Sequence, residues 1–308
     1  MKIIVTGGAG FIGSHVVDEY VNAGHRVVVI DNLRTGFKKN VNPKAKFYNA
    51  DIEDRAAMDR IFKKERPEIV NHHAAIAQVV ESVRDPLPTL RVNVLGIANA
   101  LIAFGTYGRG ARHKFIFSST GGAMYGTPKK LPVAETQASL TLSPYGLSKQ
   151  LGEETIKFYA RFFGFDYFIF RYANVYGPRQ NPKGEAGVVA IFGRIMKSGA
   201  QPTIFGDGTK ARDYVYVGDV ARANLAALRR GKDETANLGL GALVTDQMIF
   251  DAIAKEVGFK GTVKYAPYRT GEIYRISLDA RKAKKILGWT PKVKLREGIQ
   301  RTLATISA

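Results

Sequence analysis

Cysteine is absent from this chain of 308 residues. Its absence excludes a disulfide framework, a thiolate nucleophile and a metal site built from thiolates. Long apolar runs are missing as well, because the longest are strand-sized and interrupted by glycine or charge, and residues 1–5 lead straight into a glycine loop rather than a cleavage site. We therefore expect no signal peptide, no membrane span and a cytoplasmic protein.

Acidic residues are scarce, which leaves a large positive charge. Lys and Arg number 46 against 27 Asp and Glu, so the formal net charge is +19. Such a charge attracts polyanions, nucleic acid included. The basic residues are nevertheless scattered, and their densest group, at 281, 282, 284 and 285, is typical of one solvated helix face without a nucleic-acid-binding motif. We expect attraction of anionic nucleotides and no nucleic-acid partner.

Several common catalytic motifs are also missing. The chain has no Gly-x-Ser-x-Gly, no Walker loop and no His-Glu-x-x-His, so hydrolase and kinase functions have no motif to support them. The adjacent pair His72 and His73 would point to opposite faces of a strand and has no Asp, Glu or Cys at ligand spacing. We therefore predict no metal site and interpret both as core or cofactor-contacting residues.

The first half of the chain alternates strand-like and helical patterns. Apolar strands separated by helices of ten to twenty residues are typical of a parallel sheet covered on both faces, which is a doubly wound α/β fold. The expected strands are Lys2 to Thr6, Arg26 to Asp31, Lys46 to Ala50, Ile69 to His73, Lys114 to Ser119 and Tyr167 to Arg171, and the expected helices are Ile12 to Ala23, Arg55 to Glu65, Leu90 to Phe104 and Tyr145 to Phe163.

After Arg171 the pattern loosens into loops rich in glycine and proline, such as 176–182 and 204–208. Loops of this kind suit a smaller lobe that folds over a ligand at the carboxyl ends of the strands. We predict a dinucleotide-binding Rossmann domain over residues 1–172 and a smaller α/β substrate-binding lobe over 173–308. No linker separates the two, so we expect them to interdigitate.

A glycine-rich loop follows the first expected strand. Gly7, Gly10 and Gly13 would permit a tight turn, close approach of the backbone to a pyrophosphate, and close packing of helix on strand. A plain strand-turn-helix is the alternative. Asp31 ends the next strand about 20 residues on, where a carboxylate accepts hydrogen bonds from the ribose hydroxyls and repels a 2′-phosphate. NAD is favoured over NADP, although Arg34 is nearby and Asp31 could instead cap a turn.

Tyr145 and Lys149 are four residues apart on an expected helix, so they share one helix face. A nearby ammonium, helped by a positive nicotinamide ring, would lower the phenol pKa from its usual value of about 10 and make phenolate a usable base. Chance surface pairs have this spacing too. Because Tyr145 and Lys149 follow a dinucleotide-binding loop in the sequence, the pair is a candidate for catalysis.

Together these motifs resemble the extended short-chain dehydrogenase/reductase family, within it the nucleotide-sugar epimerases and dehydratases, over nearly the whole chain. Residues 6–13 match the family's cofactor loop, and residues 115–120 match the strand that delivers a third catalytic hydroxyl. The resemblance implies Thr120 for that role beside Tyr145 and Lys149. Ser119 is the alternative, because the following segment 121–125 is one residue longer than the commonest form.

The resemblance also implies which residues hold the two ligands, NAD and a UDP-sugar. Asn174 would contact the diphosphate, Gly187 and Val188 would line the base, Phe205 would pack on uracil, Arg212 and Arg269 would clamp the phosphates, Ile276 would limit the size of the sugar, and Thr120 would reach it. The implied NAD contacts are Gly7, Gly10, Phe11, Ile12, Gly13, Asp31, Asn32, Gly36, Asp51, Ile52, His73, Ala74, Ala75, Asn93, Ser118, Tyr145, Lys149 and Ala173.

The implied reaction is reversible inversion at C4 of UDP-glucose and UDP-galactose through a 4-keto intermediate and transient NADH. A 4-epimerase acting on N-acetylhexosamines or uronates is one alternative, and a 4,6-dehydratase is another, although 121–123 carry no titratable side chain where dehydratases carry Asp-Glu. A non-catalytic dinucleotide sensor would not need Thr120, Tyr145 and Lys149 together. The family also implies a homodimer through the two helices Leu90 to Phe104 and Tyr145 to Phe163.

Overall fold

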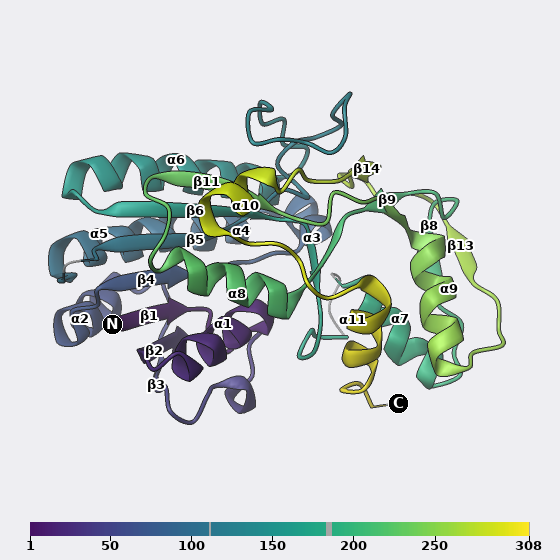
Figure 1. Cartoon of the computed structure of the whole chain (residues 1–308), viewed down its shortest axis with the longest axis horizontal. Helices are drawn as coiled ribbons and strands as arrows, with labels where there is room; N and C mark the ends of the chain where they lie inside the picture. The colour runs from purple at the N-terminus through teal and green to yellow at the C-terminus, as the bar shows by residue number, and fades with distance from the viewer. Residues whose placement is uncertain (111, 183–186, 308) are drawn as a thin grey trace.

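A seven-stranded parallel sheet forms the centre of the protein, as the computed structural model describes it for residues 1–110, 112–182 and 187–307 (Figure 1). Adjacent strands are parallel throughout, so all seven end at the same edge. In spatial order the strands are β11 (Glu234–Leu238), β6 (Asp166–Tyr172), β5 (Lys114–Thr120), β4 (Ile69–His72), β1 (Lys2–Thr6), β2 (Arg26–Asp31) and β3 (Lys46–Asn49).

Alternating apolar side chains build a core on each face of this sheet. In β1, Ile3 and Val5 belong to one core and Ile4 to the other, because successive side chains of a strand point to opposite faces. Helices α1 (Phe11–Asn22), α8 (Val217–Ala227) and α10 (Arg281–Leu287) cover the first face, and α2 (Arg55–Glu65), α5 (Ile97–Tyr107) and α6 (Pro144–Phe163) cover the second. The doubly wound α/β fold is confirmed.

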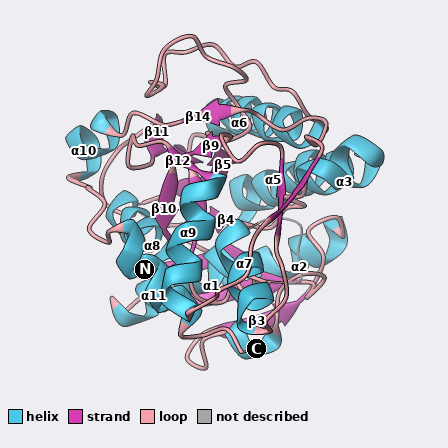
Figure 2. Ribbon diagram, turned by 90° about the vertical axis from the view of Figure 1, so that its right-hand side faces the viewer, coloured by secondary structure: helices cyan, strands magenta, loops and turns pink. Residues whose placement is uncertain are grey.

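A third core lies in a smaller group of elements beyond the carboxyl edge of the sheet. Figure 1 shows helices α7, α9 and α11 together at one end of the molecule, and Figure 2 looks onto this end. The elements outside the sheet and its covering helices are α3 (Val79–Arg84), α4 (Pro86–Leu90), α7 (Val188–Lys197), α9 (Asp246–Val257), α11 (Leu295–Leu303), the 3₁₀ turn Lys38–Asn40, the π-helical turn Arg91–Gly96, β7 (Asn174–Tyr176), β8 (Thr203–Phe205), β9 (Ala211–Arg212), β10 (Tyr214–Tyr216), β12 (Val244–Thr245), β13 (Lys264–Ala266) and β14 (Arg275–Ile276).

The chain crosses between the two predicted parts. Strand β11 comes from the second part, yet it pairs with β6 and completes the central sheet. The pairing joins Glu234 to Phe168 and Leu238 to Tyr172. The division at residues 172 and 173 therefore stays a prediction of domain organisation, and the sheet itself draws on both sides of it.

One helical segment differs from the expectation of strand-sized apolar runs. Within the described residues, the helix over 86–107 is long and apolar enough to cross a membrane by length and composition, with a mean hydropathy of 1.5. Its most apolar window is 44% buried. In the fold, its α4 and α5 portions pack on α6, and α5 also packs on α2, which is the environment of a core helix.

A buried ion pair fixes α6 to the two strands beside it. Arg171 on β6 donates two hydrogen bonds to the Glu153 carboxylate on α6, at 2.9 and 2.7 Å, and Ser119 on β5 donates a third at 2.6 Å. Glu153 is 1% exposed. Because α6 carries Tyr145 and Lys149, this pair sets their position relative to the end of β5.

Glu153→Ala should therefore destabilise the protein strongly. Removing the carboxylate leaves the buried Arg171 guanidinium without its charge partner, which costs about 3–5 kcal/mol of unfolding free energy. Urea or thermal unfolding measures this loss. Glu154→Ala is the matched control on the same helix, since Glu154 is exposed and forms a surface ion pair with Lys157, so it should cost about 0.5 kcal/mol or less. Equal losses in the two variants would contradict the role given to Glu153.

Candidate active site

Two cavities meet beyond the carboxyl ends of the strands. The first, about 400 Å³, is lined by the glycine loop, the end of β2 and the start of α6, and the second, about 530 Å³, is lined mainly by the smaller lobe. We call them the dinucleotide cavity and the substrate cavity. Six residues line both: Ala77, Gln78, Thr120, Tyr145, Val175 and Gln180. Any reaction between two bound ligands would take place at this junction.

The glycine loop forms one wall of the dinucleotide cavity. Gly7 has φ of +69°, and a Cβ on Gly13 would lie 2.2 Å from the Gly7 carbonyl oxygen, so neither position admits a larger residue without a shift. Helix α1 begins at Phe11 directly after the loop, and its first residues line the cavity. A helix N-terminus with free backbone N–H groups suits a diphosphate.

The carboxylate of Asp31 lines the dinucleotide cavity beside the glycine loop. Its Oδ2 accepts a hydrogen bond from Ala9 N at 3.0 Å and its Oδ1 one from Leu33 N at 2.8 Å, which hold the side chain in one orientation at the end of β2. Beside it, Asn32 donates to Asp51 at 2.8 Å. The three side chains form a polar corner suited to an adenosine ribose.

Sixteen of the eighteen predicted NAD contacts line this cavity, and Gly36 and Asn93 do not. Asn93 is buried and bonds both the N–H and the carbonyl of Ile76, at 2.8 and 2.9 Å, so it shapes the loop after β4 from behind. A Cβ on Gly36 would lie 2.9 Å from Ala9, which places Gly36 against the back of the glycine loop. His73 lines the cavity, and burial lowers its pKa to about 3, so the ring is neutral.

Tyr145 lies in the first turn of α6, at the junction of the cavities. Ser143 caps this helix by accepting a hydrogen bond from Gly146 N at 3.2 Å, and Pro144 occupies the first turn, where its missing N–H costs nothing. The Tyr145 phenol shares a hydrogen bond with Thr120 at the end of β5. One turn further on, the Lys149 ammonium donates to the Ser118 carbonyl at 2.7 Å.

The alternative hydroxyl, Ser119, points away from the site. Its Oγ donates to Glu153 inside the core, and Ser119 lines neither cavity. Thr120 lines both. Because successive residues of a strand face opposite sides, only one of the two hydroxyls can face the cavities, and that one is Thr120.

Burial governs the titration of the two helix residues. It raises the pKa of Tyr145 to about 12, against a lowering by the hydrogen bond with Thr120. It lowers the pKa of Lys149 to about 7, against a raising by Glu153. The sequence predicts that Lys149, together with a positive nicotinamide ring, lowers the phenol pKa. In the protein alone the cost of ionising a buried phenol is larger than the help it receives, so this lowering stays a prediction for the NAD-bound protein.

Seven of the eight predicted substrate residues line the substrate cavity: Thr120, Asn174, Gly187, Val188, Phe205, Arg212 and Arg269. Ile276 does not line it. Ile276 is 2% exposed and packs in the main core, and Ile273 contributes to the lining instead. Ile276 thus occupies a core position, since the strand pairing of β14 with β9 fixes which side chains turn inward.

The two predicted phosphate-binding arginines have protein partners. Arg212 donates to the Tyr274 carbonyl at 3.0 Å, and burial lowers its pKa. The Arg269 guanidinium lies over the Phe205 ring, 3.5 Å from its centroid, and covers the aromatic face predicted to pack on uracil. A cation stacked on an exposed ring gains about 0.5–1 kcal/mol, which a bidentate phosphate contact exceeds, so Arg269 can exchange one partner for the other.

Sequence reasoning missed four of the six junction residues, Ala77, Gln78, Val175 and Gln180. Gln180 belongs to the loop 176–182 that the sequence marked as a ligand-covering segment, so a signal existed for it. Gln78 follows β4 by six residues and carries no motif. Only the tertiary structure brings it beside Thr120 and Tyr145.

Comparison with known proteins gives consistent matches. The model of the NAD dependent epimerase/dehydratase family matches residues 3–239. A putative UDP-glucose 4-epimerase of Methanocaldococcus jannaschii is 50% identical over 301 residues, covering 98% of this chain and 97% of that protein. The crystal structure of the UDP-glucose 4-epimerase of Thermotoga maritima with UDP-glucose is 48% identical, with a TM-score of 0.96 and coverage of 99% and 98%. That of Thermus thermophilus with NAD is 41% identical, with a TM-score of 0.94 and the same coverage.

The buried Lys149 should make stability depend on pH. Its pKa is about 7 in the folded chain and about 10.5 when unfolded, so between these values the unfolded chain binds more protons and stability rises with pH. Lys149→Met removes this contribution. Both proteins are measured without cofactor. From pH 7 to 10.5, the free energy of unfolding of the unsubstituted protein should rise relative to that of Lys149→Met by on the order of 4 kcal/mol.

Urea unfolding at several pH values measures this difference. Lys157→Met, on the same helix but at the surface, is the control and should follow the pH profile of the unsubstituted protein. If Lys149→Met follows that profile too, Lys149 is not buried as a neutral amine.

Proposed function

The chain belongs to the NAD-dependent epimerase/dehydratase family, and we propose that it interconverts UDP-glucose and UDP-galactose by reversible inversion at C4. The observation that carries the proposal is the junction of the two cavities, where Tyr145 and Thr120 face both. Relatives that are 50% and 39% identical, and a solved structure that is 48% identical, bear the name of a UDP-glucose 4-epimerase. NAD is the cofactor.

The residues of the dinucleotide cavity fit NAD. The glycine loop and the start of α1 would hold the pyrophosphate, Asp31 the adenosine ribose, and Lys149 the nicotinamide ribose. NAD supplies the acceptor for the C4 hydride and the store from which it returns. The nicotinamide end would lie toward Ser118 and Tyr145, because these residues line the end of the cavity next to the junction.

Tyr145 would act as the base. Its phenolate takes the proton of the sugar's 4-hydroxyl, directly or through Thr120, as the C4–H bond breaks and a 4-keto sugar forms. A pKa of about 12 makes phenolate scarce in the protein alone, so the positive nicotinamide ring and a protonated Lys149 must both favour it. Tyr145 then returns the proton to the 4-oxygen as hydride arrives at the opposite face of the ketone.

The junction favours return of the hydride over elimination of water. Loss of water across C5 and C6 would need a base at C5 and an acid for the leaving hydroxyl. Among the six junction residues, all of them described, Tyr145 is the only one with a titratable side chain. Residues 121–123 add none. A 4,6-dehydratase would therefore lack its acid and base here.

The sugar is proposed to be a neutral hexose. A uronate would bring a carboxylate to the junction, and none of the six junction residues is a cation. Lys149, the nearest cation on α6, is directed at the Ser118 carbonyl. Epimerases for N-acetylhexosamines remain the second candidate, since Ile276 was predicted to limit sugar size and lies in the core instead.

In the substrate cavity, Asn174, Arg212 and Arg269 would hold the diphosphate, and Gly187, Val188 and Phe205 would surround the uracil. This assignment requires Arg269 to leave the Phe205 ring when the nucleotide arrives. An aromatic face freed in this way suits a flat base, and a guanidinium pairs with phosphate oxygens through two parallel hydrogen bonds.

A homodimer is proposed from the exposed apolar side chains of two helical segments, 86–107 and 144–163. Six large apolar side chains are at least 40% exposed there, which is more than a solvated helix face needs. Two copies of this face would pack as a four-helix bundle. The residues are Leu87, Leu95, Leu147, Leu151, Phe158 and Phe162.

Replacing the proposed base should abolish most activity. Tyr145→Phe keeps the ring and removes the hydroxyl, so kcat should fall about 10²- to 10⁴-fold while fold and NAD binding remain. Thr120→Ala should cost less, because the phenolate can still reach the 4-hydroxyl directly. Steady-state kinetics with UDP-galactose compare the two. A Tyr145→Phe enzyme with unchanged kcat, or one faster than Thr120→Ala, would show that the base is assigned wrongly.

Proton NMR of UDP-galactose incubated with the protein and NAD tests the function itself. UDP-glucose should appear until the two hexoses reach equilibrium, with no 4-keto-6-deoxy sugar. Parallel incubations with UDP-N-acetylglucosamine and UDP-glucuronate should turn over more slowly. A 4-keto-6-deoxy product would indicate a dehydratase, and an unchanged spectrum with every sugar would favour a dinucleotide sensor.

A further inference from the structure

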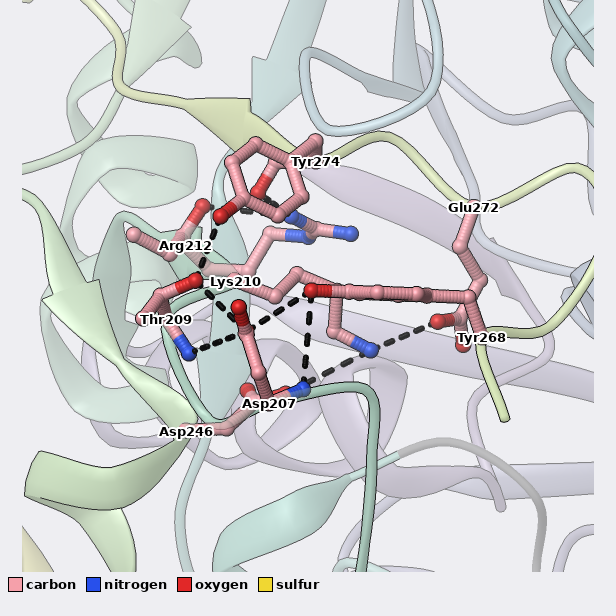
Figure 3. Close-up of polar contacts among 9 residues, drawn as sticks. Asp207, Thr209, Lys210, Arg212, Asp246, Tyr268, Glu272 and Tyr274 are labelled. Carbon is pink, nitrogen blue, oxygen red and sulfur yellow. Dashed lines mark hydrogen bonds and ion pairs between the residues drawn. The ribbon is translucent and has the colours of Figure 1, made fainter. Parts of the chain in front are cut away.

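A group of charged side chains with little exposure lines the substrate cavity outside the junction. The Lys210 ammonium lies 2.6 Å from the Glu272 carboxylate and 3.3 Å from the Asp246 carboxylate (Figure 3). The side chains of Lys210, Asp246 and Glu272 are 10%, 11% and 22% exposed, and all three line the cavity together with Arg212. No motif in the sequence singled out this group.

The three residues come from separate segments. Lys210 precedes β9, Asp246 opens α9, and Glu272 belongs to the segment 268–274, which we call the strap. The loop 206–210 holds the strap at two further points, where Tyr268 donates to Asp207 at 2.7 Å and the hydroxyls of Thr209 and Tyr274 share a hydrogen bond (Figure 3). Since Arg269 is part of the strap, the position of this arginine depends on these contacts.

The two carboxylates pose an electrostatic problem for the proposed substrate. A nucleoside diphosphate brings at least two negative charges into a cavity wall that already carries two, and like charges in a partly desolvated site repel strongly. Burial raises the pKa of Asp246 and the neighbouring Lys210 opposes this rise, which indicates that Lys210 helps to keep the carboxylate ionised. Lys210 is thus the cation that forms ion pairs with both carboxylates, and Arg212 adds a further attraction to them.

We propose that Lys210 is a positioning residue for the nucleotide: it neutralises Asp246 and Glu272 and fixes the strap, so that Arg212 and Arg269 can hold the diphosphate. This role rests on the proposed function, because it assumes a nucleoside diphosphate in the cavity. Lys210 keeps its two carboxylate partners when the ligand binds and does not itself contact the phosphates. Lys210 therefore affects the affinity for the nucleotide and does not affect the rate of the chemical step at Tyr145.

Calorimetric titration of the NAD-loaded protein with UDP tests the proposal. Lys210→Gln should raise the Kd for UDP roughly 10- to 100-fold, because the unpaired carboxylates would repel the diphosphate in a partly desolvated site. KM for the UDP-sugar should rise in parallel while kcat stays within about twofold. Lys210→Arg, which keeps the charge, should bind UDP nearly as the unsubstituted protein does. Lys264→Gln removes an equal charge from the exposed surface of β13 and is the matched control.

A second substitution distinguishes neutralisation from direct contact. Lys210→Gln combined with Asp246→Asn removes one of the two uncompensated carboxylates and restores the net charge of the group, so UDP affinity should recover to within about threefold of the unsubstituted protein. Higher salt should likewise reduce the difference in UDP affinity between Lys210→Gln and the unsubstituted protein, because salt screens the repulsion. A loss of fold alone would produce neither recovery, and thermal unfolding of each variant monitors it.

Three results would be decisive against the proposal or its premise. Normal UDP affinity in Lys210→Gln would show that the ion pairs have no bearing on the nucleotide. A double variant that stays weak would show that neutralising the carboxylates is not how Lys210 supports nucleotide binding. Failure of the unsubstituted protein to bind UDP would contradict the proposed function, which the first two results leave intact.

Discussion

The parallel direction of the seven strands is the constraint on which the rest of the molecule depends. Strands that run the same way end at the same edge, so the ends of β1, β2, β4, β5 and β6 deliver their following loops to one side. The glycine loop, Asp31, the loop after β4 and Thr120 meet there for this reason alone. Helices packed on both faces bury apolar surface against the sheet, and this burial stabilises the strands that position the loops at that edge.

The same burial that stabilises the fold sets the chemistry at the junction of the cavities. Tyr145 and Lys149 are enclosed between α6 and the ends of the strands, which makes ionisation of either group expensive. A bound cofactor with a positive ring changes that balance at the moment when a base is needed. The Glu153–Arg171 pair lies directly behind these residues and gives α6 a fixed place, because a buried ion pair is stable only with both partners in position.

Under the proposed function, the smaller lobe has to bind a strongly anionic ligand among charges of both signs. Among the described residues, three cations and two carboxylates line its wall, and each cation has a partner within the protein. Arg269 stacks on Phe205, Arg212 bonds a carbonyl, and Lys210 bridges two carboxylates. The arginines can be released by phosphate because their present partners are weak, whereas the lysine is held between two ion pairs.

Local patterns in the sequence determined the fold class, the glycine loop and the Tyr145–Lys149 pair, because each depends on residues a few positions apart whose geometry the backbone fixes. The choice between Ser119 and Thr120 needed the sheet, since only the strand's facing decides which hydroxyl reaches the cavities. Other features depend on long-range contacts alone. Asn93 lies behind the site, and Ile276 lies in the core. Strand β11 joins the sheet, and Gln78 lies at the junction. Likewise, the partners of Lys210 lie far along the chain, at 246 and 272, and no spacing in the sequence encodes a contact that forms only when separate segments pack together.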